Sequence, residues 1–419
     1  MTHDQLYAQL QTYLECKLPD YLDLLQQMVA INSFTANADG VNTLGKLTAD
    51  RFTELGFMAE TVPSAVPGFG RHLVLTRPGK SGRCVGLVSH LDTVFPPEEE
   101  WRNNFAWRQE GNRIYGPGTV DIKGGTVLIY MMMDALRTLL PAVFDDITWV
   151  ILVDASEEAE AEDFGRLCIE RLAGPETLAC LIFEGGQMDG RNFLLVVARK
   201  GMAIFRAAVE GKASHAGSAH ENGANAIVQL AHTIQQLAAV TDYERQVTVN
   251  VGTVNGGTVT NRVPHHAEAM LEMRTFAPQI YDATVAEILS LDGQSAIRSL
   301  NGGYPCQVRI EMTRKTPPWP RNEATDSLFN VWQAAAVELG YRVAPEERGG
   351  LSDGNHFWHI IPTIDGLGPS GGNAHCSEQS DDGSKEQEYV LVPSFVPKTL
   401  LNTAALLKLI GFATTGEKL

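Results

Sequence analysis

The sequence predicts an α/β fold with a largely parallel central sheet, interrupted by a smaller inserted α+β sandwich. Three observations support this prediction. A chain of 419 residues is too long for one compact core, which favours two domains. Helix-like and strand-like segments alternate through the first half, as in parallel sheets that helices cover. From about residue 201 the pattern changes to two helices and about four strands, and the α/β alternation resumes near residue 316.

Apolar periodicity places the individual elements of the first half. The N-terminal segment has the pattern of an amphipathic helix that is interrupted near Pro19. The expected helices are residues 42–55 and 124–139, and the expected strands are residues 72–78, 83–92, 147–156 and 180–185. Ligands bind beyond the carboxyl ends of parallel strands, so we expect the chemistry of the protein there.

The inserted sandwich is predicted at residues 201–315, between two segments of the α/β domain at residues 1–200 and 316–419. Its expected strands are residues 202–211, 246–257, 266–276 and 306–315, and its expected helices are residues 225–240 and 281–291. Alternating polarity in these strands indicates a sheet with one buried face.

Composition limits the partners and the compartment of the protein. The formal net charge is -17 and no basic stripe is present, which excludes nucleic acid and anionic membrane as expected partners. No run reaches the roughly 18 apolar residues of a membrane span. The N-terminus lacks the basic start and apolar core of a signal peptide, and the six cysteines have no paired spacing. We therefore expect reduced thiols and a cytoplasmic protein.

A histidine and an aspartate end the apolar strand at residues 83–92. His90 and Asp92 point to the same face of a strand, because the side-chain period is two. The carboxylate of Asp92 can then orient the imidazole of His90, which is what a metal-binding histidine needs. The alternative is a hydrogen-bonded pair that serves only the structure.

Acidic residues end two further candidate segments. Asp121 follows a Gly-rich turn and precedes an apolar helix, so its carboxylate could bridge cations or only cap the helix. Glu157 and Glu158 follow the strand at residues 147–156. One could bind metal while the other takes a proton from water, whereas an acidic run of this kind can also be a solvated face.

Glu184 ends another buried strand, and His375 lies in a Gly-rich loop before the last predicted helix. Each of these signals is weak by itself. Taken together, two imidazoles and three carboxylates at strand ends suit two zinc ions with nitrogen and oxygen ligands. The proposed donors are His90, Asp121, Glu158, Glu184 and His375.

The order and the residues of these motifs resemble those of the di-zinc metallopeptidase and amidohydrolase family. That family includes glutamate carboxypeptidase, aminoacylase, succinyl-diaminopimelate desuccinylase and acetylornithine deacetylase. The matching motifs are SHLDTV, GPGTVDIKGG, SEE, FEGG, GKASHAG and the loop that carries His375. The resemblance implies a zinc-peptidase-like catalytic domain and an inserted lid and dimerisation domain.

The resemblance also implies a role for each residue of the catalytic domain. His90 and Glu184 would hold one Zn²⁺, Glu158 and His375 would hold the other, and Asp121 would bridge them, with Co²⁺ or Mn²⁺ as substitutes. Glu157 would be the general base, and Asp92 would orient His90. The peptide bond after Asp121 would be cis.

In the inserted domain the resemblance implies three further residues. His215, in GKASHAG, would reach the active site of a partner subunit and donate to the oxyanion, which makes a homodimer the expected assembly. Asn261 and Arg274 would contact the substrate. A guanidinium suits a bidentate contact with a carboxylate, although Arg274 at a strand end could also be a surface charge.

The expected activity is zinc-dependent hydrolysis of the amide bond of a C-terminal amino acid in a small peptide or N-acyl amino acid. Glutamate is one candidate for the released residue. Two alternatives stay open: a biosynthetic deacylase of the desuccinylase or acetylornithine deacetylase type, and a catalytically silent member that binds peptides.

Overall fold

The computed structural model describes residues 2–159 and 162–412, and its contacts divide the chain into two compact units. Unit 1 comprises Met1–Val197, Arg321–Glu347 and Ser352–Leu419, and unit 2 comprises Ala198–Pro320 and Arg348–Leu351. The predicted insertion at residues 201–315 is close to the main segment of unit 2. That the two units are separate catalytic and lid domains stays a prediction.

Unit 1 contains a six-stranded sheet in the order β1-β2-β6-β3-β7-β15. Its strands are β1 (Met58–Pro63), β2 (Arg71–Arg77), β3 (Cys84–His90), β6 (Thr148–Asp154), β7 (Thr177–Ile182) and β15 (Thr363–Ile364). Strands β6, β3, β7 and β15 pair in parallel, and β2 pairs antiparallel with both β1 and β6. The predicted α/β fold with a largely parallel sheet is confirmed.

Two smaller sheets also lie mainly in the described part of unit 1. One has the order β14-β9-β8 and the other has the order β16-β17-β5-β4. Their strands are β4 (Arg108–Glu110), β5 (Arg113–Tyr115), β8 (Met188–Asp189), β9 (Asn192–Arg199), β14 (Arg342–Arg348), β16 (Gly371–Gly372) and β17 (Tyr389–Leu391).

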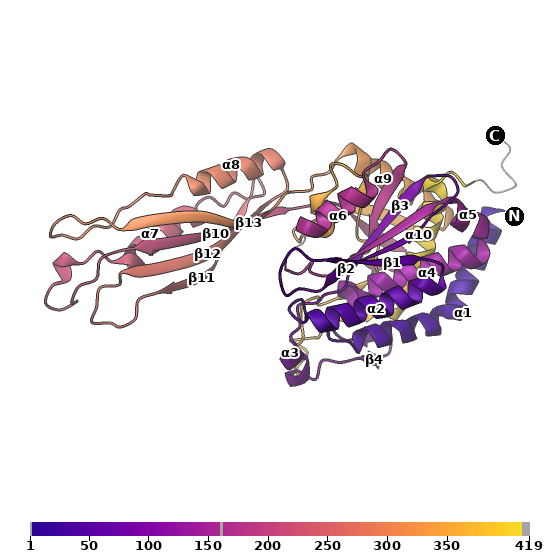
Figure 1. Cartoon of the computed structure of the whole chain (residues 1–419), viewed down its shortest axis with the longest axis horizontal. Coiled ribbons are helices and arrows are strands. Elements are labelled where there is room, and N and C mark those ends of the chain that lie inside the picture. Colours follow the sequence, from indigo (N-terminus) through magenta and orange to yellow (C-terminus); the bar gives the residue numbers. More distant parts are fainter. Residues whose placement is uncertain (1, 160–161, 413–419) are drawn as a thin grey trace. The chain divides into compact units, whose positions relative to one another are not determined.

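Helices cover both faces of the six-stranded sheet; Figure 1 shows α2 and α4 on one side and α6 on the other. The helices of unit 1 are α1 (His3–Val29), α2 (Ala38–Glu54), α3 (Pro97–Arg102), α4 (Gly124–Leu139), α5 (Pro141–Asp146), α6 (Glu162–Leu172), α9 (Glu323–Glu338) and α10 (Phe395–Leu409). None of the helices in the described part of the chain is both long and apolar enough to cross a membrane.

The predicted interruption of the first helix near Pro19 is wrong, because α1 continues through this residue to Val29. Proline removes one backbone hydrogen bond from a helix, and that loss is tolerated where water can reach the freed carbonyl. Pro19 is exposed, while Leu14, Tyr21 and Leu25 on the other face of α1 are buried in the core. Tertiary packing therefore outweighs the local propensity.

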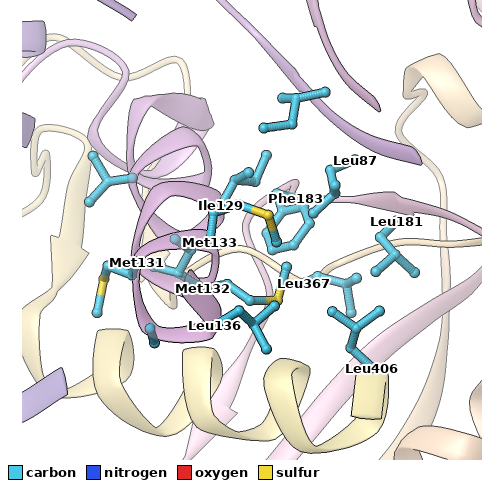
Figure 2. Close-up of a cluster of buried hydrophobic side chains, with 14 of the residues drawn as sticks. Leu87, Ile129, Met131, Met132, Met133, Leu136, Leu181, Phe183, Leu367 and Leu406 are labelled. Atoms are coloured by element: carbon cyan, nitrogen blue, oxygen red, sulfur yellow. The ribbon is translucent and has the colours of Figure 1, made fainter. Parts of the chain in front are cut away.

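Helix α4 lies in the centre of the core, and its apolar side chains surround it. Met131, Met132 and Met133 are consecutive and all fully buried, so they face different neighbours. Figure 2 shows Met132 and Met133 on the side of the helix that faces Phe183 and Leu367, and Met131 on the opposite side. Most residues of α4 are apolar and buried, and its predicted range of 124–139 is confirmed.

Unit 2 contains a four-stranded antiparallel sheet in the order β11-β12-β10-β13, with two helices on one face. Its elements are β10 (Gly201–Glu210), α7 (Ala226–Ala238), β11 (Thr248–Gly256), β12 (His266–Thr275), α8 (Pro278–Leu289) and β13 (Gln307–Thr316). The alternation along β12 buries Ala267, Ala269, Leu271 and Met273 against both helices. The predicted set of four strands and two helices is confirmed.

A buried histidine joins β2 to β6 and α6. His72 is 1% exposed, and its Nδ1 and Nε2 lie 2.9 and 3.1 Å from carboxylate oxygens of Asp154 and Asp163. The N–H of Ala155 also faces Nδ1 at 3.2 Å, but the carboxylate is closer and charged, so Nδ1–H donates to Asp154. Burial lowers the pKa of His72, but the two carboxylates outweigh this effect and raise the pKa to about 9.

We expect His72 to make the stability of unit 1 depend on pH. The folded protein holds the His72 proton up to a pKa of about 9, against 6.5 for the unperturbed group. This stabilisation is therefore complete below pH 6.5 and is lost as the pH rises through 9. The free energy of unfolding lost in His72→Gln should be about 2–3 kcal/mol larger at pH 6 than at pH 9.5 in urea titrations. A difference that does not change with pH would contradict a charged His72.

The start of α4 packs against the residue that precedes Glu184, and only glycine allows this contact. A Cβ atom on Gly125 would lie 2.1 Å from the carbonyl oxygen of Phe183. Gly125→Ala should therefore lower the free energy of unfolding by about 1–3 kcal/mol, as overpacked cores do, measured by chemical denaturation. Gly174→Ala is the control, because a Cβ there meets nothing within 4 Å. Equal stability of the two variants would contradict the contact.

Candidate metal centre

His90 is the last residue of β3 and is buried, with 1% of its surface exposed. Its Nδ1 lies 3.0 Å from the backbone oxygen of Asp92 and 3.5 Å from the Asp92 carboxylate. Both neighbours accept hydrogen bonds, so Nδ1 carries a proton and Nε2 is the nitrogen that faces the other donors. The sequence predicts that the carboxylate orients His90, whereas the backbone oxygen of the same residue is the nearer partner.

The carboxylate of Asp92 connects the end of β3 to the turn after β6. It accepts hydrogen bonds from the backbone N–H groups of Glu157 at 3.1 Å and Glu158 at 3.2 Å. The hydroxyl of Thr35 donates to it at 2.6 Å. Asp92 therefore fixes the backbone of the two acidic residues in addition to its contact with His90.

Asp121 lies in the irregular segment Thr119–Lys123, which directly precedes α4. Its peptide bond to Ile122 is cis, and this prediction is confirmed. Gly118 starts the segment with a φ of +75°, a conformation that favours glycine. The two carboxylate oxygens of Asp121 face different imidazoles: Oδ1 lies 3.1 Å from His90 Nε2, and Oδ2 lies 3.2 Å from His375 Nε2.

His375 lies in the loop between β16 and β17 and is half-exposed. Its φ of +67° is unusual for a residue other than glycine, and such conformations are concentrated at functional sites. Besides Asp121, Nε2 of His375 lies 3.1 Å from Oε1 of Glu158. The loop thus brings the second imidazole to the acidic turn after β6.

The donors form two groups that share Asp121: His90, Asp121 and Glu184, and Asp121, Glu158 and His375. Within each group the candidate ligand atoms lie within 4.8 Å of one another. Two ligands of a tetrahedral zinc lie about 3.3 Å apart. The measured separations of 3.1, 3.2 and 3.1 Å, and 3.7 Å between His90 and Glu184, agree with this value. One nitrogen and two oxygens per group fit zinc chemistry.

Charge and burial shift the pKa values of these groups. Hydrogen bonds with Asp121 and Glu158 raise the pKa of His375 to about 11. Burial acts to raise the pKa of Asp121, but the hydrogen bonds from His375 and His90 outweigh it and hold this pKa well below its usual range. Burial raises the pKa of Glu158, and the charge of Asp121 adds to the effect. Such strongly perturbed neighbours are typical of functional sites.

Glu157 has the environment of a general base. Burial raises its pKa well above the usual value, and the charges of Glu184 and Glu158 add to the increase, while His90 opposes it. A carboxylate with a raised pKa accepts protons more readily near neutral pH. The charges of four donors, His90, Asp121, Glu158 and Glu184, thus act on Glu157, which follows β6 in the chain.

The other three predicted residues lie in unit 2. His215 is exposed, and its Nδ1 accepts hydrogen bonds from the N–H groups of Gly217 and Ser218, both at 3.1 Å. The proton of the neutral imidazole therefore sits on Nε2, which can donate to a ligand. The backbone oxygen of Asn261 accepts from Ala216 N at 3.0 Å, so the segments that carry His215 and Asn261 are neighbours.

Arg274 is already engaged within unit 2. Its Nε and Nη2 donate to the two carboxylate oxygens of Glu272, at 3.1 and 3.3 Å. Its Nη1 donates to the backbone oxygen of Gly349 at 2.9 Å. The bidentate edge that would bind a substrate carboxylate thus faces an internal carboxylate.

Sequence reasoning missed two residues that support the site. Thr35 holds Asp92, and the buried Glu388 accepts hydrogen bonds from the backbone of Val120 and Asp121. Burial raises the pKa of Glu388 to about 8, with the charge of Asp121 adding to the effect. Neither residue belongs to a periodic pattern or a paired motif, so no local signal could have found it.

The model of peptidase family M20/M25/M40 matches residues 86–386, a range that includes all seven predicted residues of unit 1. Carboxypeptidase G2 of Pseudomonas sp. (strain RS-16) is 27% identical over 396 residues, which span 94% of this chain and 90% of that protein. Succinyl-diaminopimelate desuccinylase of Burkholderia lata is 24% identical over 368 residues, 84% of this chain and 92% of that protein.

Solved structures share the fold. Aminopeptidase PepT from Bacillus cereus has a TM-score of 0.72 and 23% identity, covering 94% of this chain and 99% of that chain. At this level of identity the likeness concerns the architecture of the chain.

Proposed function

Because the chain belongs to peptidase family M20/M25/M40 and is therefore a hydrolase, we propose that it removes a C-terminal amino acid from a small peptide or N-acyl amino acid. Two Zn²⁺ ions, replaceable by Co²⁺ or Mn²⁺, would serve as its cofactors. The observation that carries this proposal is the Asp121 carboxylate, whose two oxygens lie 3.1 and 3.2 Å from the Nε2 atoms of His90 and His375. One carboxylate placed between two imidazoles is suited to bridging two ions.

In this proposal, each of the two groups of donors holds one ion. His90 and Glu184 would hold one ion, Glu158 and His375 would hold the other, and Asp121, which belongs to both groups, would be shared between them. When bound, the ions supply Lewis-acid chemistry: they polarise the scissile carbonyl and lower the pKa of a water toward about 7.

Glu157 accepts a proton from the attacking water as the water oxygen bonds to the carbonyl carbon. It then gives this proton to the leaving nitrogen as the carbon–nitrogen bond breaks, so the products are a carboxylic acid and a free amine. The Nε2–H of His215, whose tautomer Gly217 and Ser218 set, is suited to donate to the developing oxyanion. In the proposed homodimer, this His215 belongs to the other subunit.

The substrate class is supported by the similarity to carboxypeptidase G2. In this proposal Asn261 and Arg274 contact the substrate, and its α-carboxylate replaces Glu272 on the guanidinium of Arg274. The similarity to a desuccinylase supports the second candidate, a biosynthetic deacylase. A silent binding member is disfavoured, because the chain retains all five donors and Glu157.

A cytoplasmic location is also part of the proposal. All six cysteines are unpaired in the structure. Reduced thiols are the rule in that compartment.

Replacement of Glu157 should separate catalysis from metal binding. Glu157→Ala removes the proton acceptor, so kcat should fall by about 10³-fold or more, while the metal content measured by mass spectrometry stays at the wild-type level. Glu162→Ala is a matched control in the same acidic run, since Glu162 forms an ion pair with Arg166 on the surface of α6. Retention of activity in Glu157→Ala would refute the assigned role.

A substrate panel should identify the activity. We expect peptides and N-acyl amino acids with a free α-carboxylate to be hydrolysed with a kcat/KM about 10²-fold above that of their carboxamide analogues, because a charged hydrogen bond contributes about 2–3 kcal/mol. Arg274→Ala should remove most of this preference. Faster hydrolysis of N-succinyl-diaminopimelate or N-acetylornithine than of all peptides would favour the deacylase. No turnover by the zinc-loaded protein would favour the binding member.

A further inference from the structure

Glu388 is a fully buried glutamate that directly precedes β17 and has no role in the proposed reaction. Its Oε1 accepts hydrogen bonds from the N–H groups of Val120 at 2.9 Å and Asp121 at 3.2 Å. The hydroxyl of Thr119 lies 3.5 Å from the same oxygen. One carboxylate oxygen thus accepts from two consecutive peptide groups of the segment that carries the bridging residue.

These two N–H groups depend on Glu388. The segment Thr119–Lys123 has non-helical backbone angles at Asp121 and Ile122, so it lacks the regular ladder in which helical N–H groups find acceptors. Buried N–H groups without an acceptor are costly, which favours whichever backbone position keeps both hydrogen bonds. The side chain of Glu388 therefore fixes the direction in which the Asp121 carboxylate leaves the backbone.

The backbone of Glu388 also contacts the loop that carries His375, another of the proposed ligands. Its N–H donates to the oxygen of Cys376 at 2.7 Å, directly after His375. Its carbonyl accepts from Gly116 N at 3.4 Å, at the start of the turn that leads to Asp121. One residue thus connects the loop of His375 with the segment of Asp121.

We infer that Glu388 is a positioning residue that holds the Asp121 carboxylate between the two imidazoles and thereby sets the affinity for both metal ions. The inference rests on the proposed function, because it requires Asp121 to bridge two ions. Groups that orient metal ligands typically change metal affinity 10–100-fold when they are replaced.

The test is a titration of the metal-free full-length protein with Co²⁺, followed by its visible absorption, and with Zn²⁺ in competition with a chromophoric chelator. Glu388→Ala removes the acceptor, and we expect both ions to bind at least about tenfold more weakly. Glu388→Gln keeps one oxygen acceptor. The second oxygen of Glu388 has no hydrogen-bond partner among the described residues, so Gln should bind within about threefold of wild type.

Glu386→Gln is the matched control. Glu386 lies two residues away and accepts hydrogen bonds from Tyr115 at 2.8 Å and Asn373 at 3.1 Å, with no contact to Asp121. Its replacement should leave metal affinity unchanged. This control separates the effect of Glu388 from a general disturbance of the loop.

Circular dichroism shows whether Glu388→Ala is folded, and this result decides which variants are compared. If Glu388→Ala folds and binds both ions as wild type does, the inference is overturned. If it does not fold, Glu388→Asp replaces it: the shorter side chain withdraws the acceptor, so Asp should bind at least about fivefold more weakly than Gln, and equal affinities would overturn the inference. A wild-type protein that binds no ions would instead refute the proposed function, and the inference with it.

Discussion

The carboxylate of Asp121 is the group on which the arrangement of the donors in unit 1 depends, because both groups of donors share it. Its two oxygens face the Nε2 atoms of His90 and His375, residues that are far apart in the sequence. Three carboxylates so close together, largely removed from water, repel one another unless positive charge lies between them. Two divalent cations in the shared groups of donors would supply that charge. Strand pairing and hydrogen bonds in the surrounding structure hold the donors in this geometry.

The first contribution to this geometry comes from the parallel sheet. Strands β3 and β6 pair in parallel with His90 opposite Asp154, so the residues that follow the two strands emerge at the same edge. Asp92 then joins the two ends by accepting from the N–H groups of Glu157 and Glu158. Asp92 thus contacts His90, a proposed ligand, and the backbone of Glu157 and Glu158, the proposed base and a second proposed ligand. Asp92 therefore does more than orient the imidazole of His90, because it also holds the backbone of Glu157 and Glu158.

The sequence predicted those parts of the structure that local patterns encode. The apolar runs that became β3, β6 and α4 were visible because burial gives them a distinct period or an unbroken apolar composition. The interruption at Pro19 was wrong, because α1 is stabilised by packing that a local pattern does not contain. Long-range supports such as Glu388 lie outside any motif.

The same limit applies to the candidate site residues, some of which could be predicted from the sequence and some of which could not. The donors could be predicted because chemistry restricts which side chains bind metal, and the resemblance gave each one a role. The engagement of Arg274 with Glu272 and Gly349 was not visible, since it depends on a neighbour along β12 and on the segment Arg348–Leu351. The sequence indicates which side chains can bind a ligand. Whether those side chains already form hydrogen bonds with other residues is seen only in the structure.

The split of unit 1 into segments before and after unit 2 has a consequence for biosynthesis. A ribosome releases residues 198–320 before it has made β15 and α10, which complete the six-stranded sheet and the core around α4. Until the last segment emerges, β7 has an open edge and His375 is missing from its group. The nascent chain therefore contains all of residues 198–320 before His375, the last member of the second group of donors, has been made.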